Sequence, residues 1–294
     1  MAIVKKHFHY IFLMICISLM SSCGISQVKR RTAGDLEKFD ANTFEISLPY
    51  LEKEPVINGD LSDWKDNAYS DGAWDIWRVS YSDWYQPERN RLTDHGNEPR
   101  PEEDLQSRYY MAWDSLYLYL GAEVHDNVND VLDSEHQPKR WYFKDCISWF
   151  VEAPHDNLAE SFKQGDNAFC FIADAKKPGY GAWWRHGTAN ESYVEEALPK
   201  QAVNYTLRMD PWKKNSADFI LEARVNMAMI LAKSDSNWRP PRIGDEYSVE
   251  IVHTDPDGGG YGGHLILYGR GDNDGTWTKM ILSGPKKPIE RKPD

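Results

Sequence analysis

The sequence predicts an all-β fold, an antiparallel β-sandwich of the immunoglobulin or jelly-roll kind, built as a single domain with long loop insertions. Short runs of strand-forming residues recur between Gly- and Pro-rich connections, which is typical of such sandwiches. The run Phe219–Val225 alternates apolar with polar residues, so we expect its polar members, Glu222 among them, to face water. Only Met227–Lys233 has a helical pattern, which covers about two turns.

The expected strands follow one another along the chain without an internal repeat. They are Phe44–Leu48, Tyr109–Trp113, Leu116–Val124, Cys146–Glu152, Ala168–Asp174, Val203–Met209, Phe219–Val225, Tyr247–His253, His264–Tyr268 and Trp277–Leu282. The stretch from Trp77 to Leu105 is rich in Pro, Asn and charge, and we interpret it as a long loop or insertion.

One strand can be assigned faces in detail. Because side chains alternate between the two faces of a strand, Leu116, Leu118 and Leu120 are expected to face the core together. Tyr117 and Tyr119 then point to the opposite face.

The chain begins with a predicted export signal. Lys5 and Lys6 form a basic start, and Phe8–Met20 is an apolar run shorter than the roughly 20 residues that a membrane-spanning helix needs. The run ends at Leu19-Met20-Ser21-Ser22-Cys23, which is similar to the lipobox of bacterial lipoproteins. We therefore expect Cys23 to carry a lipid anchor in the cell envelope; a cleaved signal followed by an incidental cysteine is the alternative.

These features divide the chain into four parts. Residues 1–22 are the expected lipoprotein signal peptide, 23–44 a tether, 45–283 the folded domain and 284–294 a polar tail. Gly24 follows the lipid site, and no aspartate stands there to direct retention in the inner membrane. In a Gram-negative cell this pattern resembles that of an outer-membrane lipoprotein.

The net charge of −12 argues against nucleic acid as a partner. Binding to nucleic acid requires clustered Lys and Arg that displace counterions from the phosphates. The only basic run near the expected anchor, Lys29-Arg30-Arg31, lies in the tether.

An ordered series of short phrases runs through the predicted domain. Its members are Pro55–Trp64 with its Asn58-Gly59 turn, Met111–Leu120, Val124–Asp126, Asp145–Glu152, Phe219–Val225 and Gly244–Ile251. This series resembles the family 9 carbohydrate-binding modules and their wider sugar-binding relatives, from about residue 45 to about residue 283. The resemblance implies a β-sandwich that binds saccharides between aromatic rings and carries structural calcium.

The chain contains 12 tryptophans, and an exposed indole can stack on the flat C–H face of a sugar. Trp64, Trp113 and Trp149 lie inside the family-like phrases and are expected in the core. For carbohydrate binding the candidates are the neighbours Trp183 and Trp184, together with Arg185 and, in a loop-like context, Trp238. Trp77 and Trp84 are weaker candidates of the same kind.

Two acidic stretches have the chemistry of a calcium site. Asp255-Pro256-Asp257 offers alternate carboxylates beside a glycine run, which suits a hard cation that needs six or more oxygens. Asp272-Asn273-Asp274 is similar, although such residues also form ordinary turns. Asp126 matches a recurrent acid of the resembled family, so the expected ligands are Asp126, Asp255 and Asp257, holding a structural calcium.

Cys146 and Cys170 fall on two successive expected strands. A hairpin could bring them opposite each other and allow a disulfide. We favour two buried thiols, because direct cross-strand disulfides are geometrically demanding.

The function that the sequence favours is carbohydrate binding without catalysis, in support of polysaccharide capture or breakdown. A glycoside hydrolase is an alternative, which requires two carboxylates about 5–9.5 Å apart. The acids considered for it are Glu123, Glu152, Glu222 and Glu250.

A haem-binding electron-transfer protein of related sandwich fold is a further alternative. Met111, Met209 and Met227 are available as axial ligands, but nothing singles out a pair.

Overall fold

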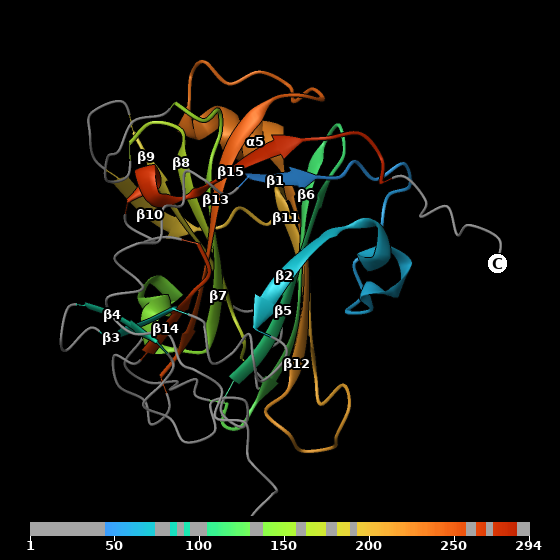
Figure 1. Cartoon of the computed structure of the whole chain (residues 1–294), viewed down its shortest axis with the longest axis vertical. Coiled ribbons are helices and arrows are strands. Elements are labelled where there is room, and N and C mark those ends of the chain that lie inside the picture. Colours follow the sequence, from blue (N-terminus) through green and yellow to red (C-terminus); the bar gives the residue numbers. More distant parts are fainter. Residues whose placement is uncertain are drawn as a thin grey trace, which may run out of the picture. The chain divides into compact units, whose positions relative to one another are not determined.

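The structure is a computed structural model that describes residues 45–73, 83–86, 91–94, 105–129, 138–156, 163–174, 181–188, 193–256, 263–268 and 273–286. These residues form two β-sheets packed face to face, so the predicted all-β sandwich is confirmed (Figure 1). None of the helices in the described ranges is long and apolar enough to span a membrane.

The larger sheet runs in the order β10-β9-β8-β7-β13-β14-β3-β4, and β15 joins it by pairing with β13 and with β1. Its strands are β1 (Glu45–Leu48), β3 (Asp83–Gln86), β4 (Arg91–Asp94), β7 (Cys146–Glu152), β8 (Asp166–Ile172), β9 (Ala182–Gly187), β10 (Tyr193–Ala197), β13 (Glu246–Asp255), β14 (Gly263–Ile266) and β15 (Thr278–Leu282). Its outer face carries the 3₁₀ turn η5 (Pro138–Phe143), and another turn, η6 (Asp274–Thr276), precedes β15.

The smaller sheet has the order β11-β12-β6-β5-β2. Its strands are β2 (Tyr69–Ala73), β5 (Leu105–Trp113), β6 (Tyr117–Asp126), β11 (Val203–Met209) and β12 (Phe219–Asn226). The helix α5 (Met227–Ser234) follows β12, and the side chain of Asn226 caps it by accepting a hydrogen bond from the Met229 backbone N–H at 3.1 Å.

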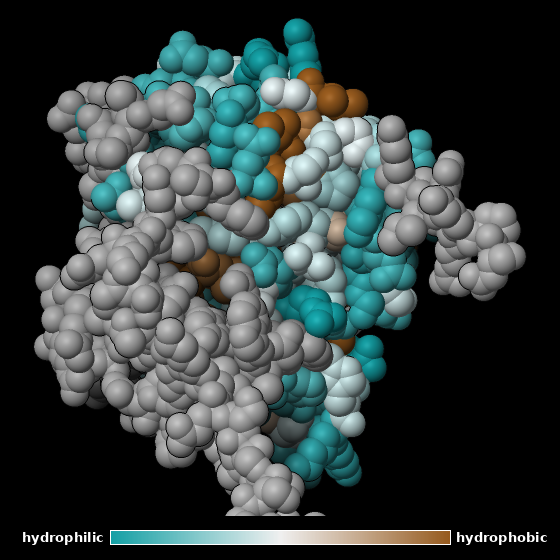
Figure 2. Space-filling model, viewed as in Figure 1, coloured by the Kyte–Doolittle hydropathy of each residue, from teal (hydrophilic) through white to brown (hydrophobic). Residues whose placement is uncertain are grey.

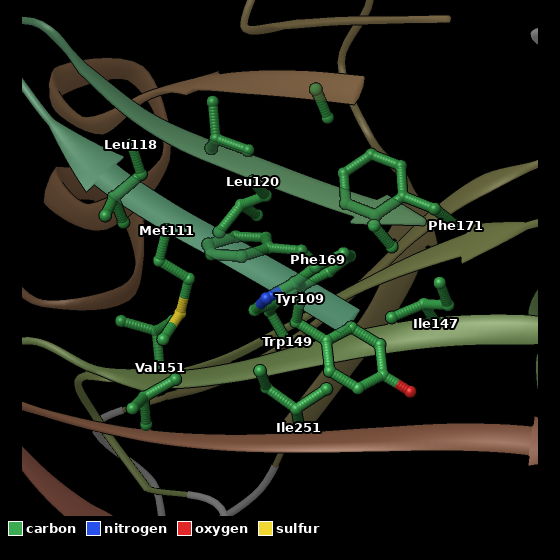
Figure 3. Close-up of a cluster of buried hydrophobic side chains, with 14 of the residues drawn as sticks. Tyr109, Met111, Leu118, Leu120, Ile147, Trp149, Val151, Phe169, Phe171 and Ile251 are labelled. Atoms are coloured by element: carbon green, nitrogen blue, oxygen red, sulfur yellow. The ribbon is translucent and has the colours of Figure 1, made fainter. Parts of the chain in front are cut away.

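The main core fills the space between the inner faces of the two sheets. Figure 3 shows Met111 and Leu120 of the smaller sheet meeting Trp149, Val151 and Ile251 of the larger one. On the surface seen in Figure 2, hydrophilic residues cover most of the described part and hydrophobic residues gather in small groups. Apolar side chains from both sheets thus interdigitate as sandwich packing requires.

A smaller apolar cluster covers the outer face of the five-stranded sheet. Leu61 and Trp64, in and after the turn η2 (Leu61–Asp63), pack there against Tyr119 and Ile220. Glu222 lies in the same layer and is fully buried, so the expectation that it faces water is wrong. The physical reason is that the segment around the Asn58-Gly59 turn folds back over this face and replaces water.

Most other sequence expectations for the fold are confirmed. Trp64, Trp113 and Trp149 are buried. Cys146 and Cys170 are buried free thiols, which confirms the preference over a disulfide. Burial raises the pKa of Cys170 to about 12, so this thiol stays protonated.

The strand beginning near Leu116 needs a correction. Leu118 and Leu120 face the core, but Leu116 is half exposed because it belongs to the turn before β6 rather than to the strand. The backbone N–H of Leu116 donates to the Asp114 carboxylate at 2.7 Å, which holds that turn. Tyr119 points to the opposite face as expected, although it is buried there.

Five of the strands in the described residues were not expected from the sequence. The region Trp77–Leu105, interpreted as a loop, contains β3, β4 and the first residue of β5. The edge strand β10 was missed because its sequence, Tyr-Val-Glu-Glu-Ala, lacks the apolar alternation of a half-buried strand, and β2 and β9 were missed with it.

Candidate functional site

The outer face of the larger sheet brings Trp183 and Arg185 of β9 next to Glu195 of β10. In the antiparallel register Arg185 lies opposite Glu195, and Trp183 lies opposite Ala197. Directly opposite residues share a face, and residues two apart on one strand do as well. Trp183, Arg185, Tyr193 and Glu195 therefore lie on one face, and we call these four residues the Arg185 surface.

Among the described residues, Glu195, Tyr193 and Trp141 contact Arg185. Its guanidinium contacts the Glu195 carboxylate, with Nη2 at 2.7 Å and Nε donating at 2.8 Å. Its Cζ lies 4.8 Å from the ring centre of Tyr193 and 5.9 Å from that of Trp141. Both nitrogens contact the same oxygen, Glu195 Oε1, and this ion pair together with the two ring contacts restricts the guanidinium.

The Arg185 surface combines exposed aromatic area with oriented polar groups. The Tyr193 side chain is 54 % exposed, and Trp183 is half-buried. The side chain of Glu195 is 24 % exposed to solvent, and that of Arg185 is 13 % exposed. Such a surface can stack on the C–H face of a pyranose and donate or accept hydrogen bonds at the sugar's edge.

A buried aromatic layer supports this surface from below. Trp141 of η5 packs with Phe150 of β7 and with Trp277, and Trp183 packs against the same cluster. The ring centres of Trp141 and Phe150 are 6.3 Å apart, and those of Phe150 and Trp277 are 5.6 Å apart. The cluster gives the Arg185 surface a rigid base.

The other expected sugar contacts lie elsewhere. Trp184 is fully buried in the main core, where its Nε1 donates to the Asn167 side chain at 3.1 Å. Its assignment to the sugar site is therefore corrected: neighbouring residues on β9 point to opposite faces, and Trp184 points inward. Trp238 is half-buried and packs against the main core, away from Arg185 on the outer face. Trp77 lies outside the described residues, and for Trp84 only its place in strand β3 is described.

The Arg185 surface contains two residues that the sequence expectations omitted, Tyr193 and Glu195. Both belong to the unexpected edge strand β10. The available signal was charge complementarity, because Glu195 follows Arg185 at a separation that a hairpin can bridge.

The structure also brings together three buried acids from the two sheets. Asp126 at the end of β6, Asp145 before β7 and Asp255 at the end of β13 have carboxylate oxygens within 4.8 Å of one another. Asp126 and Asp255 were expected as metal ligands, and Asp257 lies outside the described residues. Three buried carboxylates match the oxygen-rich donor set of a hard cation such as Ca²⁺.

Asp145 was not identified from the sequence, although a signal existed. Ile147 is an inner-face core residue, and Asp145 lies two residues before it on the same face. Asp126 is related to Val124 in the same way at the end of β6. An acid that lies on the inner face just beyond the apolar part of a strand is thus a sequence signal for a member of this buried acidic group.

A second acidic group, Glu152, Asp166 and Asp274, lies on the outer-face side of the larger sheet. Burial and the charges of Asp274, Glu152 and Asp156 raise the pKa of Asp166 to about 8. Burial opposes ionisation of Glu152 as well, but hydrogen bonds from His155, Ser248 and the Asp156 backbone leave its pKa lowered. This group therefore holds a proton on Asp166 at neutral pH.

The acids considered for hydrolysis do not share a cleft. Glu123 and Glu222 lie on the outer face of the smaller sheet, whereas Glu152 and Glu250 lie on the outer face of the larger one. All four are buried. Each accepts structural hydrogen bonds; Glu250, for example, accepts from the Ile251, Leu267 and Tyr268 backbone N–H groups.

Comparison with known proteins identifies the fold. No family model matches the sequence, and no curated protein is significantly similar to it. A family 9 carbohydrate-binding module from Caldicellulosiruptor kristjanssonii, solved with cellotriose, superimposes with a TM-score of 0.52 at 15 % identity, covering 85 % of this chain and 100 % of the module. The same kind of module solved with glucose gives 0.52 at 16 % identity, covering 84 % and 100 %.

A third solved structure, from Bacteroides uniformis, is of a protein to which carbohydrate binding is ascribed. It gives a TM-score of 0.51 at 9 % identity and covers 81 % of this chain and 99 % of its own. At these identities the likeness concerns the fold alone. The resemblance noted in the sequence is confirmed at that level: the chain has the fold of the family 9 carbohydrate-binding modules.

Proposed function

We propose that this protein binds carbohydrate without catalysis and that the Arg185 surface is where it does so. The observation that carries the proposal is the Arg185 guanidinium, fixed by Glu195 at 2.7 Å beside the exposed ring of Tyr193. Aromatic area next to an oriented donor and acceptor is what a saccharide site requires.

Binding at this surface follows from simple chemistry. The ring of Tyr193 or Trp183 covers a C–H face of the sugar and removes apolar area from water. Hydroxyl groups at the sugar's edge accept hydrogen bonds from Arg185 and donate to Glu195. Because both polar groups are already fixed by each other, little conformational entropy is lost when they bind a ligand.

The fold neighbours support the choice of first ligands. Two of them were solved with cellotriose and with glucose. We therefore begin with neutral gluco-oligosaccharides and extend the panel to xylan, mannan and other plant, algal and host glycans.

The test uses paired variants. Trp183→Ala and Tyr193→Ala should each weaken saccharide binding at least about tenfold, measured by isothermal titration calorimetry. The matched control is Arg224→Ala, because Arg224 pairs with Glu54 and lies 4.8 Å from the ring centre of Tyr117 on the other sheet. Unchanged binding in both test variants, with circular dichroism like that of the wild type, would refute the site.

We also propose that the protein is exported and anchored in the cell envelope by a lipid on Cys23, where captured polysaccharide would be presented to degrading enzymes. The support is the lipobox-like Leu19–Cys23 and the basic and apolar segments before it. Growth with a radiolabelled fatty acid tests this: the wild type should carry label and Cys23→Ala should not.

A structural calcium ion is the third element of the proposal. Asp126, Asp145 and Asp255 would hold it at the point where strands of both sheets end. Bound there, the ion would compensate the three buried negative charges and tie the two sheets together.

A further inference from the structure

The connection between β11 and β12 has a defined conformation. It runs from Asp210 to Asp218, longer than the about two to five residues usual in a hairpin. The Asp210 N–H donates to the Asp218 carbonyl at 3.0 Å, and the Ser216 N–H donates to that of Lys213 at 3.2 Å. Asp210 (φ 55°) and Asn215 (φ 60°) adopt left-handed backbone conformations that tighten the chain. Long connections of this kind are often binding loops.

Trp212 in this connection presents its indole to solvent. Its side chain is 45 % exposed, the largest exposure among the tryptophans whose side chains are described. The ring centre lies 4.3 Å from that of His125, with the planes inclined by 43°. The imidazole supports one side of the indole.

The carboxylate of Asp218 holds the His125 imidazole in position. His125 Nδ1 lies 3.3 Å from Asp218 Oδ1, and the same oxygen accepts a hydrogen bond from the Asp126 backbone N–H at 3.2 Å. Asp218 is buried. The chain of contacts from Asp126 through Asp218 and His125 to Trp212 connects the exposed ring to the end of strand β6.

We propose that Trp212, supported by His125, is a second carbohydrate contact, and that the natural ligand is a polysaccharide that reaches both this residue and the Arg185 surface. This inference rests on the proposed function. An indole with one side supported and about half its surface exposed suits a pyranose ring, which needs one flat aromatic face. The exposed Lys213 and Lys214 beside it can donate hydrogen bonds to the sugar's hydroxyls.

The two contacts lie on different parts of the sandwich. The β11–β12 connection is at the bottom of Figure 1, below β12, whereas β9 and β10 are at its upper left. Under this proposal a mono- or trisaccharide would occupy one contact, whereas a polymer would offer sugar units to both. The second engagement is then intramolecular, so avidity for the polymer exceeds the affinity of either contact by about a hundredfold or more.

The experiment compares a polymer with its own short oligosaccharide. Hydroxyethyl cellulose and cellotriose form the first pair, followed by xylan with xylotriose and mannan with mannotriose. The full-length protein is compared with Trp212→Ala, with Trp212→Tyr, which keeps a stacking ring, and with the control Met229→Ala, which removes another exposed apolar side chain. Calorimetry measures the trisaccharides, and affinity electrophoresis measures the polymers.

The expected result is selective. Trp212→Ala should weaken polymer binding by about a hundredfold and leave trisaccharide binding unchanged, while Trp212→Tyr retains most polymer binding and Met229→Ala retains all of it. If Trp212→Ala binds polymer and trisaccharide as the wild type does, the second contact is refuted and the proposed function stands. If Trp212→Ala loses the trisaccharide while Trp183→Ala keeps it, the Arg185 surface is refuted as the primary site. If the wild type binds no polymer and no trisaccharide, both proposals fail.

Discussion

The indole Nε1 of Trp64 donates a hydrogen bond to Oε1 of Glu222 over 2.8 Å, inside a layer from which water is excluded. The other carboxylate oxygen accepts from the backbone N–H groups of Asn58 at 2.7 Å and Gly59 at 2.8 Å. One acid of strand β12 thus fastens a turn more than 150 residues away in the sequence. The Asn58-Gly59 turn and Trp64 therefore act together in the fold, because both donate hydrogen bonds to the same carboxylate.

Replacing this acid should be costly for the fold. Glu222→Leu has a similar volume but leaves three donors without their acceptor, the buried ones of Gly59 and Trp64 and the part-buried one of Asn58, so we expect the free energy of unfolding to fall by about 3 kcal/mol or more. Urea denaturation measures the change. The control is Glu52→Leu, at an exposed position of the segment that contains the Asn58-Gly59 turn, and it should change the free energy of unfolding by less than about 0.5 kcal/mol. Equal effects of the two substitutions would show that the hydrogen bonds to Glu222 do not contribute to the stability of the fold.

The two adjacent tryptophans of β9 should separate folding from binding. Trp184→Ala creates a cavity in the main core and removes the hydrogen bond to Asn167, so stability should fall by about 3–5 kcal/mol. Trp183→Ala should weaken saccharide binding and destabilise the protein much less, because its ring is only half-buried. Urea denaturation and calorimetry on both variants check this, and a larger stability loss in Trp183→Ala would contradict the assigned faces.

The proton on Asp166 predicts a pH dependence of stability. Its folded-state pKa of about 8 lies above the ordinary value of 3.8, so between these values the folded protein binds more protons than the unfolded chain. Stability from this group is therefore present at low pH and is lost as pH rises toward 8, by a few kcal/mol in order of magnitude.

Asp166→Asn provides the comparison for this prediction. The amide oxygen can still accept from the Lys163 N–H, which lies 2.7 Å from the wild-type carboxylate, and the variant cannot ionise. We expect its stability relative to the wild type to rise steadily from pH 5 to about pH 8.5, measured by urea denaturation at each pH. A difference that is constant across this range would mean that Asp166 titrates normally.

Calcium should stabilise the protein through Asp126, Asp145 and Asp255. At about a hundred times the dissociation constant, a ligand of the folded state adds about 2.7 kcal/mol, which corresponds to a rise of about 5–10 °C in melting temperature for a domain of this size. Asp145→Asn should abolish the rise, and the exposed control Asp66→Asn should keep it. Identical melting curves in calcium and in chelator would refute the site.

Two strands rich in apolar and strand-forming residues show how well the sequence can predict strand bounds. Cys146–Glu152 and Val203–Met209 were predicted with the observed ends. The edge strand β10 carries Glu195 and Glu196, whose charges are compensated by Arg185 and Lys233. Such compensation is a property of the paired structure, and periodicity alone does not contain it.

The site residues show the same limit. Adjacent residues of a strand point to opposite faces, but the sequence does not say which of Trp183 and Trp184 enters the core. That choice depends on strand register, which sets Trp184 opposite Phe169 of β8 in the main core and Trp183 opposite Cys170. Asp255 was expected from the alternate carboxylates of Asp255-Pro256-Asp257 and Asp126 from the family resemblance, whereas neither signal points to Asp145.

The most direct test of the account is saccharide binding by the purified protein on a glycan array in calcium-containing buffer, with Trp183→Ala and Tyr193→Ala alongside. The account predicts selective binding by the wild type, competed by a free oligosaccharide of the same sugar and greatly reduced in both variants. No binding to any glycan by folded protein, or equal binding by all three proteins, would contradict the claim that the Arg185 surface recognises carbohydrate.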